Sequence, residues 1–408
     1  MGAAGYQRSS VVGVTVVFVV SGFLMANWLA RLPAVRDALH VTPGRLGVIM
    51  LSLSVGSVLA LPLSGPVVHR WSPAPTVLGC AVLSTGAMVL VGVAGTGRLG
   101  GVSTLVPALF AYGMGVGMWD VAMNVEGAEV ERRVERAIMP WFHAGFSLGT
   151  VAGALTGAAA AALQVALSVH LAVAAGISLV AIVIATRYFL PVPEAEAGHA
   201  SAGSGALAAW REPRTVLVGL MMLGMALAEG SANDWIALGL VDGYGVPHAA
   251  GAVGLGLFLT AMTASRLAGP VVLARFGRVR VLRSGAALVL VALVVYVLGA
   301  QGADAAAGLA ARNALPLLLA GLAVLAWGAG AALGFPVGIS AASDDPARSA
   351  ARVSVVSSIG YVAFLAGPPL LGTLADRVGI VRAMLGVSLA AILSLLCAGA
   401  ARAVDIES

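Results

Sequence analysis

Apolar segments of about twenty residues alternate with short polar segments along the whole chain. A helix of about twenty apolar residues crosses the ~30 Å hydrocarbon core of a bilayer. Because twelve such segments are present, the pattern predicts an all-α membrane protein with twelve transmembrane helices. The predicted spans cover residues 11–30, 46–68, 76–95, 102–124, 139–162, 168–189, 214–236, 249–272, 281–300, 314–338, 353–374 and 382–401.

A polar interruption at residues 191–213 divides the twelve spans into two groups of six. It is rich in Ala, Gly, Pro and Ser, which is typical of a flexible linker. We therefore expect an N-terminal six-helix bundle at 1–190 and a C-terminal six-helix bundle at 214–408. The motif Gly-Pro-Val-Val ends span two at 65–68 and span eight at 269–272. Such repeats predict two pseudo-symmetric halves, as in many transporters.

Composition and charge also indicate a membrane protein. Apolar residues make up 60% of the chain and charged residues 10%, whereas a soluble domain has about half and about a quarter. The loops on the side of the N-terminus hold roughly twice as many Arg residues as the loops on the other side. This bias predicts cytoplasmic termini, in the inner membrane of a bacterium. The net charge of +5 therefore reflects loop arginines and does not indicate nucleic-acid binding.

Two acidic residues in the predicted spans are candidates for proton coupling. Asp120 and Asn124 lie four residues apart in span four, so they share one face of a helix. Glu229 and Asn233 repeat this spacing in span seven. A carboxylate in a bilayer costs about 2.5–3.5 kcal/mol, and a carboxylate removed from water binds a proton more readily. We therefore predict that Asp120 and Glu229 carry protons, with His143 as a third candidate because imidazole titrates near neutral pH.

Other polar residues are candidates for substrate contact or for gating. The predicted substrate-binding residues are Asn27, Asn124, Asn233, Asp234, Tyr361 and Arg266. The predicted gate and loop residues are Arg70, Arg132, Arg133, Arg275 and Arg278. Structural roles are the alternative, such as a bond from Asp120 to Arg266 or Arg70 that holds the inner gate. The charged segment 126–136 is expected to be a loop that forms a salt-bridge latch.

The loops after spans two and eight resemble those of the major facilitator superfamily. The loop pattern of that family is Gly-x-x-x-Asp-Arg-x-Gly-Arg. Gly65 and Arg70 match it in part after span two, and Arg275, Gly277 and Arg278 match it in part after span eight. The layout of six spans, a central linker and six spans is also similar.

Within this superfamily the chain resembles the fucose-permease-like and uncharacterised inner-membrane branch. The similar motifs are WDVAMN at 119–124, His143-Ala-x-Phe146 and Gly360-Tyr361. In that branch an acid of span four is implicated in proton coupling, a role that the resemblance assigns to Asp120. Span one departs from the branch, because it contains no acid before its Leu-Pro pair.

The resemblance implies the major facilitator fold and a secondary active transporter that works by alternating access. We expect a monomer in the lipid bilayer that couples a small-molecule substrate to protons, with a sugar or other small polar metabolite favoured. Drug or metabolite efflux by proton antiport is the alternative, because Gly149, Gly153 and Gly157 match the spacing of an antiporter motif in span five. A transport-inactive receptor or scaffold is a minor alternative.

The sequence carries no signature of an enzyme. A phosphate-binding loop, a His-Glu-x-x-His motif and a nucleophile–His–acid set are missing from it. The two cysteines, Cys80 and Cys397, lie inside apolar segments and suit neither a disulfide framework nor a metal site. We therefore expect no cofactor and no metal.

Overall fold

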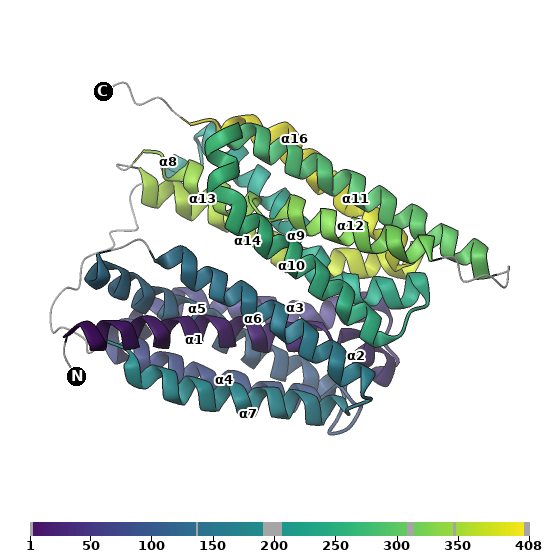
Figure 1. Cartoon of the computed structure of the whole chain (residues 1–408), viewed down its shortest axis with the longest axis horizontal. Coiled ribbons are helices and arrows are strands. Elements are labelled where there is room, and N and C mark those ends of the chain that lie inside the picture. Colours follow the sequence, from purple (N-terminus) through teal and green to yellow (C-terminus); the bar gives the residue numbers. More distant parts are fainter. Residues whose placement is uncertain (1–2, 136–137, 191–205, 308–313, 346–347, 404–408) are drawn as a thin grey trace. The chain divides into compact units, whose positions relative to one another are not determined.

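The computed structural model describes residues 3–135, 138–190, 206–307, 314–345 and 348–403. These residues are almost entirely helical (Figure 1). They contain twelve helical segments that are long and apolar enough to cross a membrane. The predicted all-α fold with twelve spans is therefore confirmed.

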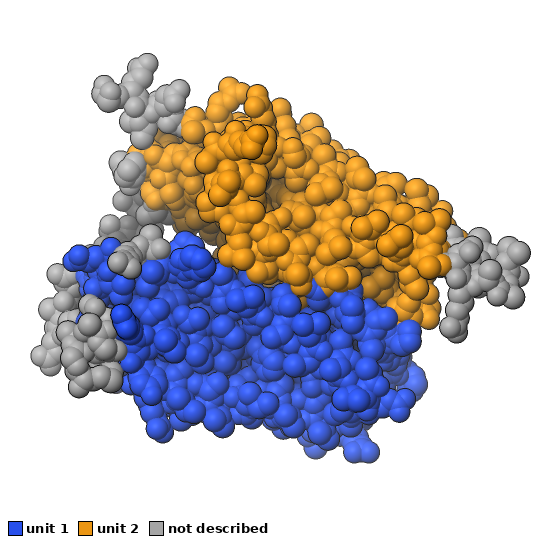
Figure 2. Space-filling model, in the orientation of Figure 1, with its two compact units in different colours: residues 1–198, 247–256 blue, residues 199–246, 257–408 orange. Residues whose placement is uncertain are grey.

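Two compact units divide the chain, and Figure 2 colours them separately. Unit 1 consists of Met1–Gly198 and Pro247–Gly256, and unit 2 consists of His199–Val246 and Leu257–Ser408. The first turns of the eighth span therefore cluster with unit 1. The predicted bundles at 1–190 and 214–408 place those turns in the second half, and that division stays a prediction. Of the predicted linker, residues 191–205 lie outside the described residues.

Unit 1 contains the first six spans. Its helices are α1 (Ala3–Leu29), α2 (Leu32–Leu39), α3 (Pro43–Trp71), α4 (Pro73–Ala94), α5 (Val102–Val134), α6 (Met139–Ala162), α7 (Leu167–Ala185) and the 3₁₀ turn η1 (Thr186–Tyr188). The first span is α1 followed by α2 after a short turn. α1 packs mainly against α6 and α7, and α5 packs mainly against α3 and α4.

Unit 2 contains spans seven to twelve, apart from the first turns of α10. Its helices are α8 (Ala206–Ala209), α9 (Pro213–Tyr244), α10 (His248–Phe276), α11 (Arg278–Ala307), α12 (Leu315–Ala331), α13 (Gly334–Ala342), α14 (Ser349–Val378), α15 (Ile380–Ala383), η2 (Met384–Gly386), α16 (Val387–Cys397) and η3 (Ala398–Ala401). α9 has neighbours on several sides, since it packs against α12, α13, α14 and α16.

Glycine allows α1 and α6 to approach closely in unit 1. A methyl group added to Gly149 of α6 would overlap the carbonyl oxygen of Val19, and one added to Gly153 would overlap that of Phe23. Gly22 of α1 faces the carbonyl oxygen of Phe146 in the same way. Small residues at helix interfaces permit this separation, which brings many backbone atoms into van der Waals contact.

The tenth span differs from the single helix predicted at 314–338. It is broken between α12 and α13, where Ala332 and Leu333 form a turn. Pro336 explains part of the break, because proline has no N–H to donate to the carbonyl of Ala332 four residues earlier. The carbonyl oxygen of Ala332 is therefore free to accept another donor inside unit 2.

The predicted loop at 126–136 is wrong for most of its length, because α5 continues to Val134. Glu129 forms ion pairs with Arg132 and with Arg133, three and four residues along the same helix. Pairs at these spacings stabilise a helix. The charged segment thus extends α5, and residues 136–137 lie outside the described residues.

We expect Gly149→Ala to destabilise unit 1, because the added methyl group must push α1 away from α6. Overpacking of this kind costs about 1–3 kcal/mol. The measurement is the thermal unfolding midpoint of the purified protein in detergent. The matched control is Gly176→Ala on α7, where an added methyl group meets nothing within 4 Å. Equal midpoints for both variants would contradict the close packing of α1 and α6.

Candidate functional site

An ion pair inside unit 2 joins the seventh and eighth spans. Nη2 of Arg266 on α10 lies 2.9 Å from Oε1 and 3.0 Å from Oε2 of Glu229 on α9. The Glu229 side chain is 14% exposed and the Arg266 side chain is 28% exposed. The two predicted candidates therefore neutralise each other, and the cation is the more accessible partner.

The break in the tenth span supplies a third contact to this pair. Nε of Arg266 donates to the carbonyl oxygen of Ala332 at 3.2 Å. That oxygen is available because Pro336 cannot donate to it. Arg266 therefore ties together α9, α10 and the turn between α12 and α13. Trp327 adds a second tie between spans seven and ten, since its Nε1 donates to the carbonyl oxygen of Ala228 at 3.1 Å.

Three half-buried aromatic residues follow one another near the Arg266–Glu229 pair. Tyr361 lies between Phe335 at a ring-centroid distance of 6.3 Å and Phe364 at 6.4 Å. Phe364 lies beside Gly230, the residue after Glu229, because a methyl group added there would come within 3.3 Å of its ring. Phe335 is in the first turn of α13, just after the turn that binds Arg266. Tyr361, a predicted substrate contact, thus belongs to an aromatic row bordering the ion pair.

Asn233 and Asp234 lie about one turn beyond Glu229 on α9, and both are half-buried. Asn233 Oδ1 is buried without a hydrogen-bond partner among the described residues. An unpaired buried acceptor is costly, so this oxygen is a candidate for a ligand or water contact. Their predicted roles in substrate binding stay predictions.

Asp120 on α5 differs from Glu229 in its surroundings. Its side chain is exposed at the surface of the protein. Asn124 Nδ2 donates to the backbone oxygen of Asp120 at 2.8 Å and lies 3.3 Å from its Oδ1. Within the described part of unit 1, no basic side chain forms an ion pair with Asp120. The predicted grouping of Asp120 with Asn124 is therefore present, and its negative charge is not neutralised inside the unit.

His143 is exposed near the start of α6. Its ring meets that of Phe18 edge to face at a centroid distance of 5.2 Å. Phe18 also stacks on Phe142 at 5.7 Å, so it bridges α1 and α6. The contact positions His143 on unit 1, and its predicted role in proton transfer stays a prediction.

Asn27 is fully buried inside unit 1 and its amide is occupied by protein contacts. Nδ2 donates to the carbonyl oxygen of Phe23 at 2.8 Å. Oδ1 lies 2.7 Å from Nε2 of His170 and accepts from Oγ1 of Thr156 at 2.9 Å. The predicted substrate residue Asn27 therefore links α1, α6 and α7 in this structure.

The predicted gate residues fall into separate groups. Arg132 and Arg133 bind Glu129 of their own helix, as described above. Arg70 is exposed at the end of α3. The guanidinium of Arg275 lies 5.4 Å from the ring centroid of its neighbour Phe276. Arg278 is the one of this set that bridges helices within unit 2.

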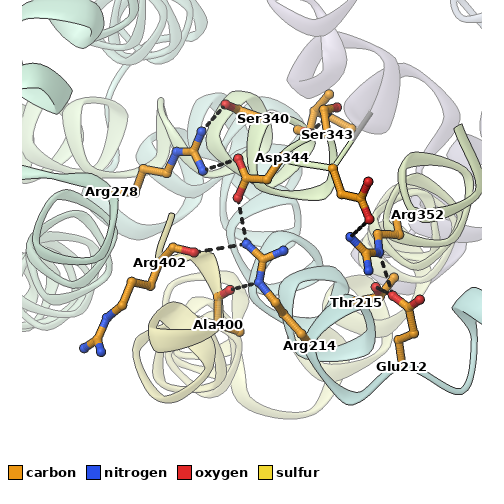
Figure 3. A network of polar contacts seen from close by, with 12 residues as sticks. Glu212, Arg214, Thr215, Arg278, Ser340, Ser343, Asp344, Arg352, Ala400 and Arg402 are labelled. Atoms are coloured by element: carbon orange, nitrogen blue, oxygen red, sulfur yellow. Dashed lines mark hydrogen bonds and ion pairs between the residues drawn. The ribbon is translucent and has the colours of Figure 1, made fainter. Parts of the chain in front are cut away.

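Arg278 belongs to a polar network at the end of unit 2 where α9, α11 and α14 begin and α16 ends (Figure 3). Asp344 accepts from Nη1 of Arg278 at 2.7 Å through Oδ1 and from Nη2 of Arg214 at 2.7 Å through Oδ2. Arg214 also donates to the carbonyl oxygens of Ala400 and Arg402. Asp344 thus connects helices that are far apart in sequence.

Sequence reasoning missed the structural contacts of three acidic or basic residues. Arg31 is 6% exposed and donates from Nη2 to the carbonyl oxygen of Val165 at 2.9 Å. Glu126 is 2% exposed and accepts from the backbone N–H of Leu190 at 2.6 Å. Asp344 is the centre of the network just described. The burial of Arg31 depends on a contact distant in sequence, which no local pattern indicates.

Comparison with known proteins identifies the family. A family model described as Major Facilitator Superfamily matches residues 13–368. The chain belongs to the Major Facilitator Superfamily. The predicted resemblance is therefore confirmed, and the protein is a multi-pass membrane transporter of the secondary class and not an enzyme. Transporters of this superfamily sit in the lipid bilayer and bind small-molecule substrates.

Relatives in the superfamily match over almost their whole length. An uncharacterised transporter of Sinorhizobium fredii is 30% identical over 89% of this chain and 90% of its own. An uncharacterised MFS-type transporter of Yersinia pestis is 28% identical over 97% of this chain and 96% of its own.

Solved structures show the same fold. The nucleoside transporter NupG has a TM-score of 0.73 at 16% identity and covers 96% of this chain and 97% of its own. A bacterial homologue of the human lysosomal transporter Spinster has a TM-score of 0.74 at 13% identity, over 99% of this chain and 100% of its own.

We expect Arg266→Gln to lower the stability of the protein at neutral pH, because it leaves the Glu229 carboxylate without its counter-charge. Removing one partner of a fully buried pair costs about 3–5 kcal/mol, and partial exposure reduces this to about 1–3 kcal/mol. The measurement is the thermal unfolding midpoint in detergent. The double variant Arg266→Gln/Glu229→Gln should recover part of the loss. A double variant less stable than Arg266→Gln would contradict this account.

A pH effect is expected at Glu212, which precedes α9. Nε of Arg352 donates to Glu212 Oε2 at 2.6 Å and lowers the pKa of that carboxyl. A lowered pKa stabilises the folded state above the ordinary pKa of Glu, near 4.3, and this stabilisation is lost as the pH falls through the folded-state pKa. Glu212→Gln should therefore lower the unfolding midpoint at neutral pH and have less effect at about pH 4. The control is Glu135→Gln, which removes an exposed acid. If the unfolding midpoint of Glu212→Gln differed from that of wild type by the same amount at every pH, the role of the ionised carboxylate would be refuted.

Proposed function

We propose that this member of the superfamily is a proton-coupled transporter in which Asp120 carries the exchanged proton. The observation that supports this is the contrast between the two acids. Glu229 is bound to Arg266, so a proton on Glu229 must compete with a guanidinium. Asp120 contacts an amide and no counter-charge in the described part of its unit, so it can bind and release a proton without breaking an ion pair.

The proposed orientation places both termini on the cytoplasmic side of a bacterial inner membrane. The Arg bias among the loops supports it. Unit 2 adds a structural argument, because Arg214, Arg278 and Arg352 lie at the same end as Arg402 near the C-terminus (Figure 3). A cluster of arginines at one end of a bundle is typical of the cytoplasmic face.

A small polar solute such as a sugar or another metabolite is the favoured cargo, moved with the proton. Efflux of a drug or metabolite in exchange for a proton is the second candidate. Its support is the glycine face of α6, where Gly149 and Gly153 pack against α1 and Gly157 against Ala30 just after it, at the spacing of the antiporter motif. The direction of the proton relative to the solute separates these two functions.

The test uses the purified full-length protein in vesicles that contain the pH-sensitive dye pyranine. Fucose, gluconate and ethidium are added outside, and their uptake is followed in parallel. Symport acidifies the lumen on solute entry, whereas antiport makes it more alkaline. We expect Asp120→Asn to lower solute-dependent proton movement at least about tenfold, because loss of a proton-transfer group typically costs this much or more.

Glu135→Gln, which removes an exposed acid at the end of the same helix, is the control and should behave as wild type. Full proton movement in Asp120→Asn would contradict the assignment to Asp120. Wild-type vesicles that transport one of these solutes without any proton movement would contradict proton coupling itself.

A further inference from the structure

We propose that the Arg266–Glu229 pair of unit 2 binds the carboxylate of an aromatic or otherwise flat organic acid, with Arg266 as the recognising cation. This inference rests on the proposed function and deepens it by naming a substrate class and a second protonation site. It arises from three features of unit 2, namely the unused edge of the guanidinium, the neutrality of the pair and the aromatic row beside it.

The guanidinium of Arg266 keeps donors available for a ligand. Its Nη2 faces Glu229 and its Nε faces the carbonyl of Ala332. Nη1 makes no such contact among the described residues. A guanidinium carries five N–H donors in one plane and matches a carboxylate well. Because the Arg266 side chain is twice as exposed as that of Glu229, an incoming group meets the positive partner first.

The charge balance of the pair links binding to a proton. Arg266 and Glu229 together are neutral, so an added carboxylate leaves one uncompensated negative charge in a poorly solvated place. Protonation of Glu229 at an Oε atom removes that charge. The guanidinium of Arg266 then pairs with the carboxylate of the solute in place of Glu229. One proton is taken up for each carboxylate bound.

The charged groups around Glu229 support this assignment. Arg266 is the charged side chain in contact with it. Of the helices packed against α9, α12, α13 and α16 contain no charged residue. α11 also packs against α9, and its charged residues lie near its two ends, Arg278, Arg280 and Arg283 at the start and Asp304 near the end. α14 carries charges in its first and last turns alone, and the 3₁₀ and short helices lie at the ends of the unit. Asp234 is on α9 itself, five residues further along and therefore on a different face of the helix.

The aromatic row favours a flat apolar body on the solute. Phe335, Tyr361 and Phe364 are half-buried, and their row begins beside the turn that binds Arg266 and ends beside Gly230. Half-buried aromatic rings offer both apolar area and specific ring contacts. A solute with an aromatic ring and one carboxylate complements both the row and the cation.

Isothermal titration calorimetry of the full-length protein in detergent tests this proposal, with benzoate as the probe and benzamide as its neutral counterpart. Titrations in two buffers of different ionisation enthalpy give the number of protons taken up. We expect about one proton per benzoate, tighter binding at about pH 5.5 than at about pH 7.5, and no binding of benzamide. Arg266→Gln should weaken benzoate binding at least about tenfold.

Two further variants separate binding from folding. Glu229→Gln should bind benzoate without proton uptake and without pH dependence, because its Arg266 is already released. The double variant Arg266→Gln/Glu229→Gln keeps the pair neutral and should still lose benzoate binding. Arg280→Gln, an exposed Arg of the same unit with the same change of charge, should bind as wild type does.

Several results would overturn the proposal. They are an absence of benzoate binding, equal binding of benzamide, wild-type affinity in the double variant, or benzoate binding by wild type without proton uptake. If benzoate fails to bind while vesicles show proton movement that depends on Asp120, this inference falls and the proposed function stands. If benzoate binds with proton uptake while no Asp120-dependent movement is found, the proposed function falls instead.

Discussion

The cost of an unpaired charge in hydrocarbon is the constraint on which this structure depends. Glu229 reduces this cost by pairing with Arg266, and Arg266 also donates to a backbone carbonyl oxygen. Arg31 and Glu126 bond to backbone groups, and Nε and Nη1 of Arg31 are buried without a partner among the described residues. Asp120 is the exception, because its unit provides an amide and no counter-charge. Water or a proton must then compensate its charge, and a carboxylate that binds a proton to stay in a membrane is suited to coupling.

The backbone groups that serve these charged residues lie where helices end or break. Val165 lies between α6 and α7, Leu190 follows η1, and Ala332 lies between α12 and α13. Helix ends leave N–H and C=O groups unpaired, and a bilayer offers no water to satisfy them. A guanidinium or a carboxylate at such a point stabilises both the charge and the break. The Pro336 interruption therefore creates the acceptor that holds Arg266 against Glu229.

Much of the fold could be predicted from the sequence, because twelve apolar segments and the spacing of polar residues are local properties. The end of α5 and the break at Ala332 were missed, since ion pairs with Glu129 extend the first and a single proline helps to cause the second. At the site, Asp120 with Asn124 followed from helix periodicity. The partner of Arg266 did not, because α9 and α10 meet only after folding. The occupied amide of Asn27 likewise depends on Thr156 and His170, more than a hundred residues away.

The central claim is that Asp120 holds an exchangeable proton while Glu229 is paired with Arg266. Infrared difference spectroscopy of the purified protein tests it directly, because a protonated carboxyl absorbs separately from a carboxylate. As the pH is lowered from about 8 to about 5, we predict a protonated-carboxyl band whose Asp120 component is present in wild type and in Glu229→Gln and is missing in Asp120→Asn. A band that persists in Asp120→Asn and disappears in Glu229→Gln would contradict the account.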